Sequence, residues 1–391
     1  MSQTWDLTLL DDFAPDPIGG SGWLGARLWH FIVTDLDGVQ VGEIAARQRK
    51  VRHAFNARAK TASCSLRLDD PLVDFILDGR ALLKAYEGDT LRFVGPLATY
   101  EETSDGTGGS VALTFADPWT ILIARLLGKT TTGYADGSAG SLKDKTLLVT
   151  NLLAAANAEG YTGIEIGDTV DTGSTSFVAF PPYKIAADAI AEVVNALDGP
   201  DIEVVPHEPT DVGGGDIQIA TLDVKSAIGG SRPNAAWEYG TGKRNVASYS
   251  RRGDLTLLLN RGFALPPSSD AAGVVVTDDD ATSIADYGLR EGLVSTDVDV
   301  AQLRQALVDE HVRIRKNPRV IVTFQPVKVD STTLGRVPEY GVDFALGDTV
   351  PFRAVSEAGV VRVNAFLRVY AVDWTIDDNG ASLPSFTLTP E

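Results

Sequence analysis

Two stretches of this sequence decide how we interpret its fold: Gly88-Asp89-Thr90-Leu91-Arg92-Phe93 and Gly347-Asp348-Thr349-Val350-Pro351-Phe352. Each consists of Gly-Asp-Thr, an aliphatic residue, a variable residue and Phe. An aromatic strand pattern follows at 97–103 and at 369–375, and it leads through an Asp/Gly turn to a closing strand. Because a repeated order of similar elements indicates an internal repeat, we expect two related β-domains with another segment inserted between them. We also expect Gly88-Asp89 and Gly347-Asp348 to shape the turns that enter equivalent strands. A chance match is the alternative.

Hydrophobic periodicity divides the chain into three regions. Residues 1–116 and 236–391 consist mainly of short alternating strands, whereas 117–235 carries the spacing of two amphipathic helices. One more helix is predicted near residues 297–316. We therefore expect a mainly β protein with an inserted α+β domain, divided at these boundaries.

Two Asp-Pro pairs mark helix starts beside strands. Asp is a good N-cap and Pro is favoured at the first helical position. We therefore expect helices after Asp70-Pro71, in the first β-domain, and after Asp117-Pro118, at the start of the insert.

Composition excludes several classes of protein. Of the 391 residues, 53 are acidic and 34 basic, which gives a formal charge of −19. Duplex-binding proteins need a basic surface, so nucleic acid is disfavoured as a specific ligand, and anionic membranes are disfavoured for the same reason. The single cysteine, Cys64, excludes an intrachain disulfide. We find neither a signal-peptide pattern nor an apolar run of membrane-spanning length, and expect a soluble protein made in a cytoplasm.

No motif in the sequence indicates catalysis. The four histidines lie too far apart for a metal-binding motif, and we find neither a Cys-x-x-Cys pair nor a nucleophile elbow. The stretch from Gly240 to Arg244 resembles a phosphate loop but lacks its first glycine and its Ser/Thr. We therefore predict no catalytic, cofactor-binding or metal-binding residues, no cofactor and no enzyme activity.

One basic stretch stands out against the negative net charge. Its six cations are Arg47, Arg49, Lys50, Arg52, Arg58 and Lys60. One interpretation is the solvated face of a strand pair and its loop. The other is a docking surface for an acidic subunit or partner protein.

The order of several motifs along the chain carries a resemblance to a known family. These motifs are Phe31-Ile32-Val33-Thr34-Asp35-Leu36-Asp37-Gly38, Val41-Gly42-Glu43-Ile44, Leu66-Arg67-Leu68-Asp69-Asp70-Pro71, Leu91-Arg92-Phe93-Val94-Gly95-Pro96-Leu97, Tyr239-Gly240, Asn245-Val246, Asn260-Arg261-Gly262, Tyr287-Gly288-Leu289-Arg290-Glu291 and Leu346-Gly347-Asp348-Thr349-Val350. In this order they resemble the tail-hub or minor tail proteins of long-tailed bacteriophages, especially those infecting actinobacteria.

The resemblance implies both a fold and a role. Such hubs contain two tail-tube-like β-barrel domains plus inserted α+β domains, and three copies form a ring. The resemblance implies a homotrimer at the virion's tail tip, assembled in the host cytoplasm, with no membrane insertion. Its partners would be the distal tail protein, the tape-measure protein and other tail-tip or fibre proteins. DNA would pass through the lumen without specific binding, and negative charge there would keep it from adhering.

Two alternatives stay open. The surplus of carboxylates and the six tryptophans fit a carbohydrate-binding or glycan-cleaving module at the tail tip. An unrelated enzyme with a site built from distant loops is the other. Because the sequence ends at Glu391, directly after a strand, we expect wall cleavage and receptor binding to belong to other chains.

Overall fold

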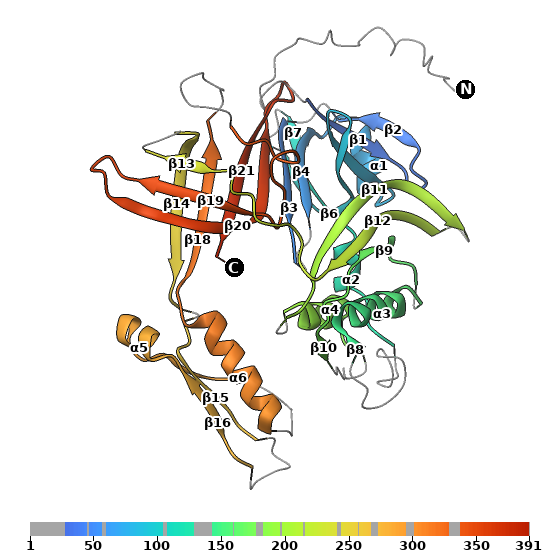
Figure 1. The fold of residues 1–391 in the computed structure, drawn as a ribbon. Coiled ribbons are helices and arrows are strands. Elements are labelled where there is room, and N and C mark those ends of the chain that lie inside the picture. Colours follow the sequence, from blue (N-terminus) through green and yellow to red (C-terminus); the bar gives the residue numbers. More distant parts are fainter. Residues whose placement is uncertain are drawn as a thin grey trace, which may run out of the picture.

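The computed structural model describes most of the chain (Figure 1). The described residues are 28–44, 47–56, 60–104, 108–128, 143–158, 160–176, 183–195, 198–213, 216–240, 244–256, 258–266, 273–294, 301–327 and 337–390. Within these ranges no helix has the length and apolar character required to cross a bilayer.

Thirteen strands form one large sheet. In chain order they are β1 (Trp29–Thr34), β2 (Gln40–Glu43), β3 (Arg47–Ala54), β4 (Thr61–Arg67), β5 (Leu82–Glu87), β6 (Thr90–Ser104), β7 (Gly109–Ala116), β13 (Trp237–Tyr239), β14 (Val246–Asp254), β18 (Arg319–Pro326), β19 (Thr349–Val355), β20 (Val361–Ile376) and β21 (Ser382–Thr389). Their main path runs β14-β18-β21-β20-β3-β4-β7-β6-β5-β1-β2, and β19 pairs with both β20 and β13. Apart from β13 with β19, all these pairs are antiparallel, which confirms a mainly β fold.

The sheet repeats one strand order in two halves. The first half has the order β3-β4-β7-β6-β5, and the second has β14-β18-β21-β20-β19. In each half one long strand, β6 or β20, pairs with different neighbours along its two parts. The halves join where β20 pairs with β3, from Ala371 opposite Ala54 to Ile376 opposite Arg49. The fold therefore contains the predicted internal repeat as a strand order.

The Gly-Asp-Thr stretches themselves do not occupy equivalent places. Gly88-Asp89 forms the turn from β5 to β6, whereas Gly347-Asp348 precedes β19. Since β6 corresponds to β20, the expectation that the two stretches enter equivalent strands is wrong. Both glycines have positive φ, 56° and 83°, which favours Gly at a tight turn and explains the similar sequences. The aromatic patterns at 97–103 and 369–375 do occupy equivalent parts of β6 and β20.

Neither half closes into a barrel within the described residues, which corrects the expectation of two β-barrels. The path of paired strands ends at β2 on one side and at β14 on the other. Closing the first half would require β2 to pair with the outer edge of β3. That edge is occupied by β20, so the two halves share one open sheet instead.

One hydrophobic core extends under both halves. Alternation places buried side chains on a single face of the strands, as in β4, where Ala62, Cys64 and Leu66 are buried. The rings of Trp29 and Trp374 pack with centroids 5.4 Å apart, so strands from the two halves contact each other directly. Helix α1 (Leu72–Leu77) adds buried residues to this core.

The Asp-Pro pairs begin helices, as predicted. The Asp70 carboxylate accepts a hydrogen bond from the backbone N–H of Leu72 at 3.0 Å, at the start of α1. Asp117 accepts one from the N–H of Trp119 at 3.2 Å, at the start of α2 (Trp119–Ile123). In both cases the side chain satisfies a helix N–H that has no partner within the helix.

The region between the two halves has a hydrophobic cluster of its own. It contains helices α3 (Lys145–Ala158) and α4 (Ala186–Val194), a sheet of β9 (Ile164–Thr169), β11 (Asp201–Gly213) and β12 (Asp216–Lys225), and the short pair β8 (Lys143–Asp144) and β10 (Thr175–Ser176). Leu152, Ile190 and Leu222 lie in its cluster. The two helices that the sequence predicted here are present.

A second insert lies between β14 and β18. It consists of β15 (Arg261–Ala264), β16 (Val276–Asp279), β17 (Glu291–Leu293), α5 (Ala281–Tyr287) and α6 (Ala301–Arg315). A small core that includes Val308 and Val312 packs α6 on β15 and β16. The helix predicted near 297–316 is α6, but no local sequence pattern indicated this separate hydrophobic cluster. In Figure 1 helices α3, α4, α5 and α6 lie below the main sheet, whereas β11 and β12 lie beside it and contact β6.

Candidate functional site

The six cations of the basic stretch do not form one surface. Arg47, Lys50 and Arg52 are exposed on β3, whereas Arg49 is buried and points to the opposite face. Lys60 is also buried, just before β4. Arg58 lies outside the described residues.

Arg49 holds three parts of the main sheet together. Its guanidinium donates one hydrogen bond to the carbonyl oxygen of Trp29 at 3.2 Å and another to that of Asp377 at 2.7 Å. It also lies 5.9 Å from the ring centroid of Phe31. These contacts connect β3 with β1 and with the turn after β20. Arg49 therefore stabilises the fold and is not available to a partner.

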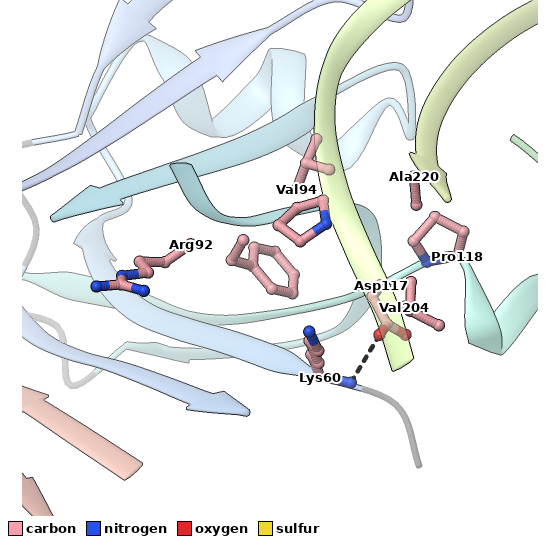
Figure 2. Close-up of a pocket in the computed structure, with 9 residues that line it drawn as sticks. Lys60, Arg92, Val94, Asp117, Pro118, Val204 and Ala220 are labelled. Carbon is pink, nitrogen blue, oxygen red and sulfur yellow. Dashed lines mark hydrogen bonds between the residues drawn. The ribbon is translucent and has the colours of Figure 1, made fainter. Parts of the chain in front are cut away.

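Lys60 connects the first half with the insert. Its ammonium lies 3.1 Å from the Glu203 carboxylate on β11. Its backbone N–H donates to Asp117 at 2.9 Å, the contact marked in Figure 2. Desolvation of Asp117 outweighs these favourable contacts and raises its pKa to about 7.

The hollow beside Lys60 is not a ligand site. It lies between the first half and the insert (Figure 2). Its lining residues are Lys60, Arg92, Phe93, Val94, Asp117, Pro118, Val204, Pro206 and Ala220. Side chains fill it so far that no room is left for a water molecule.

The exposed cations of β3 lie in the middle of a broad sheet face rich in hydroxyl groups. Cross-strand register places one row of side chains on this face, and none of them is buried: Leu383, Thr375, Lys50, Ser63, Thr114 and Thr99, from β21, β20, β3, β4, β7 and β6. A second row contains Ser385, Asp373, Arg52 and Thr61. At a strand spacing of about 4.8 Å, six strands span roughly 24 Å. We call this surface the hydroxyl face.

The charges on the hydroxyl face partly compensate each other. The Arg52 guanidinium lies 3.6 Å from the Asp373 carboxylate across the β3–β20 junction. Desolvation raises the pKa of Asp373, although Arg52 and Lys50 oppose the rise. Among the cations that the structure describes, both interpretations of the basic stretch, a solvated face or a docking surface, now concern Arg47, Lys50 and Arg52.

Sequence reasoning missed the hydroxyl face, although part of its signal was visible. The alternation of Thr61, Ser63 and Ser65 with buried residues indicates one solvated strand face. Its continuation into β20 and β21 depends on the β3–β20 pairing, which joins residues more than 300 positions apart. No local pattern reports such a pairing.

Other groups that often form sites have structural roles here. Cys64 is buried, and desolvation raises the pKa of its thiol to about 12, which makes the thiolate rare at neutral pH. Trp29, Trp119, Trp237 and Trp374 are buried, and the other two tryptophans lie outside the described residues. Within the described ranges, no three His, Cys, Asp or Glu side chains come together as a metal site would require.

Comparison with known proteins shows the fold. No family model matches the sequence, and no curated protein matches it. The 43 kDa tail protein of prophage MuSo2 from Shewanella oneidensis superposes with a TM-score of 0.61 at 10% identity, covering 92% of this chain and 97% of that one. The tail protein from Neisseria meningitidis MC58 gives 0.58 at 11% identity, with 93% and 97% covered. Prophage tail protein gp18 from Listeria monocytogenes gives 0.54 at 12% identity, with 93% and 94% covered. The chain thus shares its fold with phage tail proteins over nearly its whole length.

Proposed function

We propose that this protein is a structural component of a bacteriophage tail. The observation that carries the proposal is the fold shared with three phage tail proteins over 92–93% of this chain. A structural role also accounts for the molecule's polar clusters. Lys60, Glu203 and Asp117 connect parts of the chain to each other, and the hollow that Lys60 and Asp117 line has no room for a water molecule.

The proposed position is the tail hub. Three copies would form a ring that continues the tail tube and meets the distal tail protein, the tape-measure protein and the tip or fibre proteins, with DNA passing through its lumen. Two similar five-strand units in one chain support this arrangement, because three such chains offer six similar units to a sixfold tube. The ordered motifs of the sequence support the same position.

The first test is the solution mass of the purified protein by light scattering, with electron microscopy of the same peak. A trimer of the 41.6 kDa chain has a mass of about 125 kDa, and we expect a ring with a central hole. A mass of 41.6 kDa at every concentration tested would contradict the proposed trimer.

The second test concerns the exposed cations of β3. If the hydroxyl face docks an acidic surface, Lys50→Glu with Arg52→Glu should weaken trimer formation at least about tenfold, since like charges would then meet. Arg49 stays unchanged, because its replacement would disturb the fold. Arg80→Glu with Arg353→Glu, at two other exposed positions, changes the charge equally and serves as the control. If both variants form trimers equally well, the exposed cations of β3 belong to a solvated face and not to a docking surface.

The carbohydrate-binding alternative has little support among the described residues, because their four tryptophans are buried and cannot stack on a sugar. A cell-wall pulldown separates the two functions. We expect no retention of the purified trimer, whereas retention that soluble glycan competes away would favour the alternative.

A further inference from the structure

We propose that the N-terminal segment of one subunit pairs as an extra strand with β2 of a second copy of this chain. The proposal rests on the oligomer proposed above and names one contact within it. It starts from β2, which is the last strand of the main sheet. Among the described strands, β2 pairs only with β1, so its outer edge carries free backbone N–H and C=O groups.

The surroundings of β2 are unusually apolar for a free edge. Val39 and Val41 are 62% and 42% exposed, and Leu36 in the preceding turn is 48% exposed. Gly42 lies against the Leu72 side chain, so Val41, its neighbour in the strand, points to the opposite face. An exposed apolar edge is a template for pairing with another strand, and proteins normally cover or charge such edges.

The N-terminal segment has the pattern of a matching strand. In Thr4-Trp5-Asp6-Leu7-Thr8-Leu9, apolar side chains alternate with polar ones, as in a strand with one buried face. The following residues include Pro15, Pro17 and several glycines, which favour an extended linker over a continued element. This composition fits a short strand that pairs with an exposed sheet edge and is joined to β1 by an extended linker. We call the linker, residues 11–27, the tether.

The length of the tether favours a second copy as the occupant. Residues 11–27 separate Leu10 from Leu28, and 17 extended residues reach up to roughly 56 Å. The chain's own free edge lies only about 10 Å from β1, which is two strand spacings. The tether is thus several times longer than its own edge requires and long enough to reach a neighbouring subunit.

The point where the tether leaves the sheet is fixed. The carbonyl of Leu28 accepts a hydrogen bond from the N–H of Gly88 at 2.9 Å, and the N–H of Trp29 donates to Gly380 at 3.0 Å. Another edge strand of the main sheet, β14, suits the segment less well. Its exposed side chains include Ser248, Ser250 and Arg252, which offer no apolar surface to Trp5, Leu7 and Leu9.

Disulfide cross-linking tests the pairing, because the only native cysteine is buried and weakly reactive. One protein carries Leu9→Cys and a second carries Val41→Cys, and the two are mixed at the trimer's working concentration and oxidised. A docked segment holds the thiols at an effective millimolar concentration, so we expect a linked dimer to form roughly a hundredfold faster than from free chains. Leu9→Cys mixed with Ser248→Cys, at the β14 edge, is the matched control.

The outcomes separate this proposal from the proposed function. A mixed dimer with Val41→Cys, and little with Ser248→Cys, supports the exchange. A trimer that gives no mixed dimer overturns it and leaves the hub intact. In a single chain carrying both Leu9→Cys and Val41→Cys, a disulfide within the chain would show that the segment covers its own edge, which also overturns the exchange. A monomeric protein overturns the proposed hub itself.

Discussion

Two regions of this chain, residues 47–116 and 246–389, build the same order of five antiparallel strands and connect them differently. The first connects β4 to β5 through α1, while the second places the insert with α5 and α6 between β14 and β18. The shared features are alternation and one long strand that serves two neighbours. The same strand order therefore forms with different connections, and in both regions a buried face specifies the register of each pair.

The two Gly-Asp-Thr turns should differ most when their aspartates are removed. The Asp348 carboxylate is buried and accepts hydrogen bonds from the N–H groups of Gly230 and Ala345, at 2.7 and 2.8 Å. Arg232 donates a third at 3.1 Å. We expect Asp348→Ala to lower the free energy of unfolding by about 3 kcal/mol, because three hydrogen bonds to a buried carboxylate are lost. Chemical denaturation measures this.

The matched variant is Asp89→Ala, in the corresponding stretch of the first half. Asp89 is exposed in a hairpin turn, so we expect a change below about 0.5 kcal/mol. Equal losses in the two variants would contradict the different roles of the buried Asp348 and the exposed Asp89.

The residues that follow the equivalent strands β7 and β21 should contribute differently to the pH dependence of the free energy of unfolding. After β7 stands Asp117, whose burial raises its pKa from 3.8 to about 7, whereas Thr389-Pro390 ends β21. Because the folded pKa exceeds the unfolded one, this group's stabilisation is present below about pH 4 and is lost as the pH rises through 7. We expect the wild type to lose roughly 2 kcal/mol more than Asp117→Asn between pH 5 and pH 8.

Asp144, at the start of α3, is the control for that measurement. Desolvation alone would raise its pKa, but hydrogen bonds from Thr146 and Thr172 outweigh desolvation and lower the pKa. Its stabilisation is therefore lost only on acidification below about pH 4. Asp144→Asn should change stability equally at pH 5 and pH 8. A wild-type curve parallel to that of Asp117→Asn would contradict the role of Asp117.

The smallest effects concern neighbouring residues on the two faces of β3, the strand that joins the halves. Arg49→Ala leaves the carbonyls of Trp29 and Asp377 without their donor, so we expect a loss of about 1–2 kcal/mol. Lys50 is exposed on the hydroxyl face, and Lys50→Ala should change stability by less than about 0.5 kcal/mol. Thermal unfolding of the two single variants checks the pair. A larger loss for Lys50→Ala would mean that the exposed row supports the junction.

The sequence identified the cations of the candidate site but not which of them are exposed. Sequence reasoning found the cations of β3 because clustered charge is visible in any window. It could not separate Arg49 from Arg47, which alternation alone would place on the same face, because a bulge with a positive φ at Gln48 shifts the register between Arg47 and Lys50. It placed Lys60 with the same surface, although a contact 143 positions away with Glu203 makes Lys60 part of the interior. The charge of a side chain can be read from the sequence, whereas its burial depends on which distant residues pack against it.

The sequence by itself determined the local elements. Alternation specified the strands, Asp-Pro pairs began α1 and α2, and helical spacing placed α3, α4 and α6, since each of these signals acts over a few residues. Tertiary structure alone decided that β20 pairs with β3, that the halves form an open sheet, and that a hydroxyl face runs across both. These features depend on backbone hydrogen bonds between distant strands, and such bonds are open to any strand with a free edge. Which edge is taken depends on the packing of the shared core.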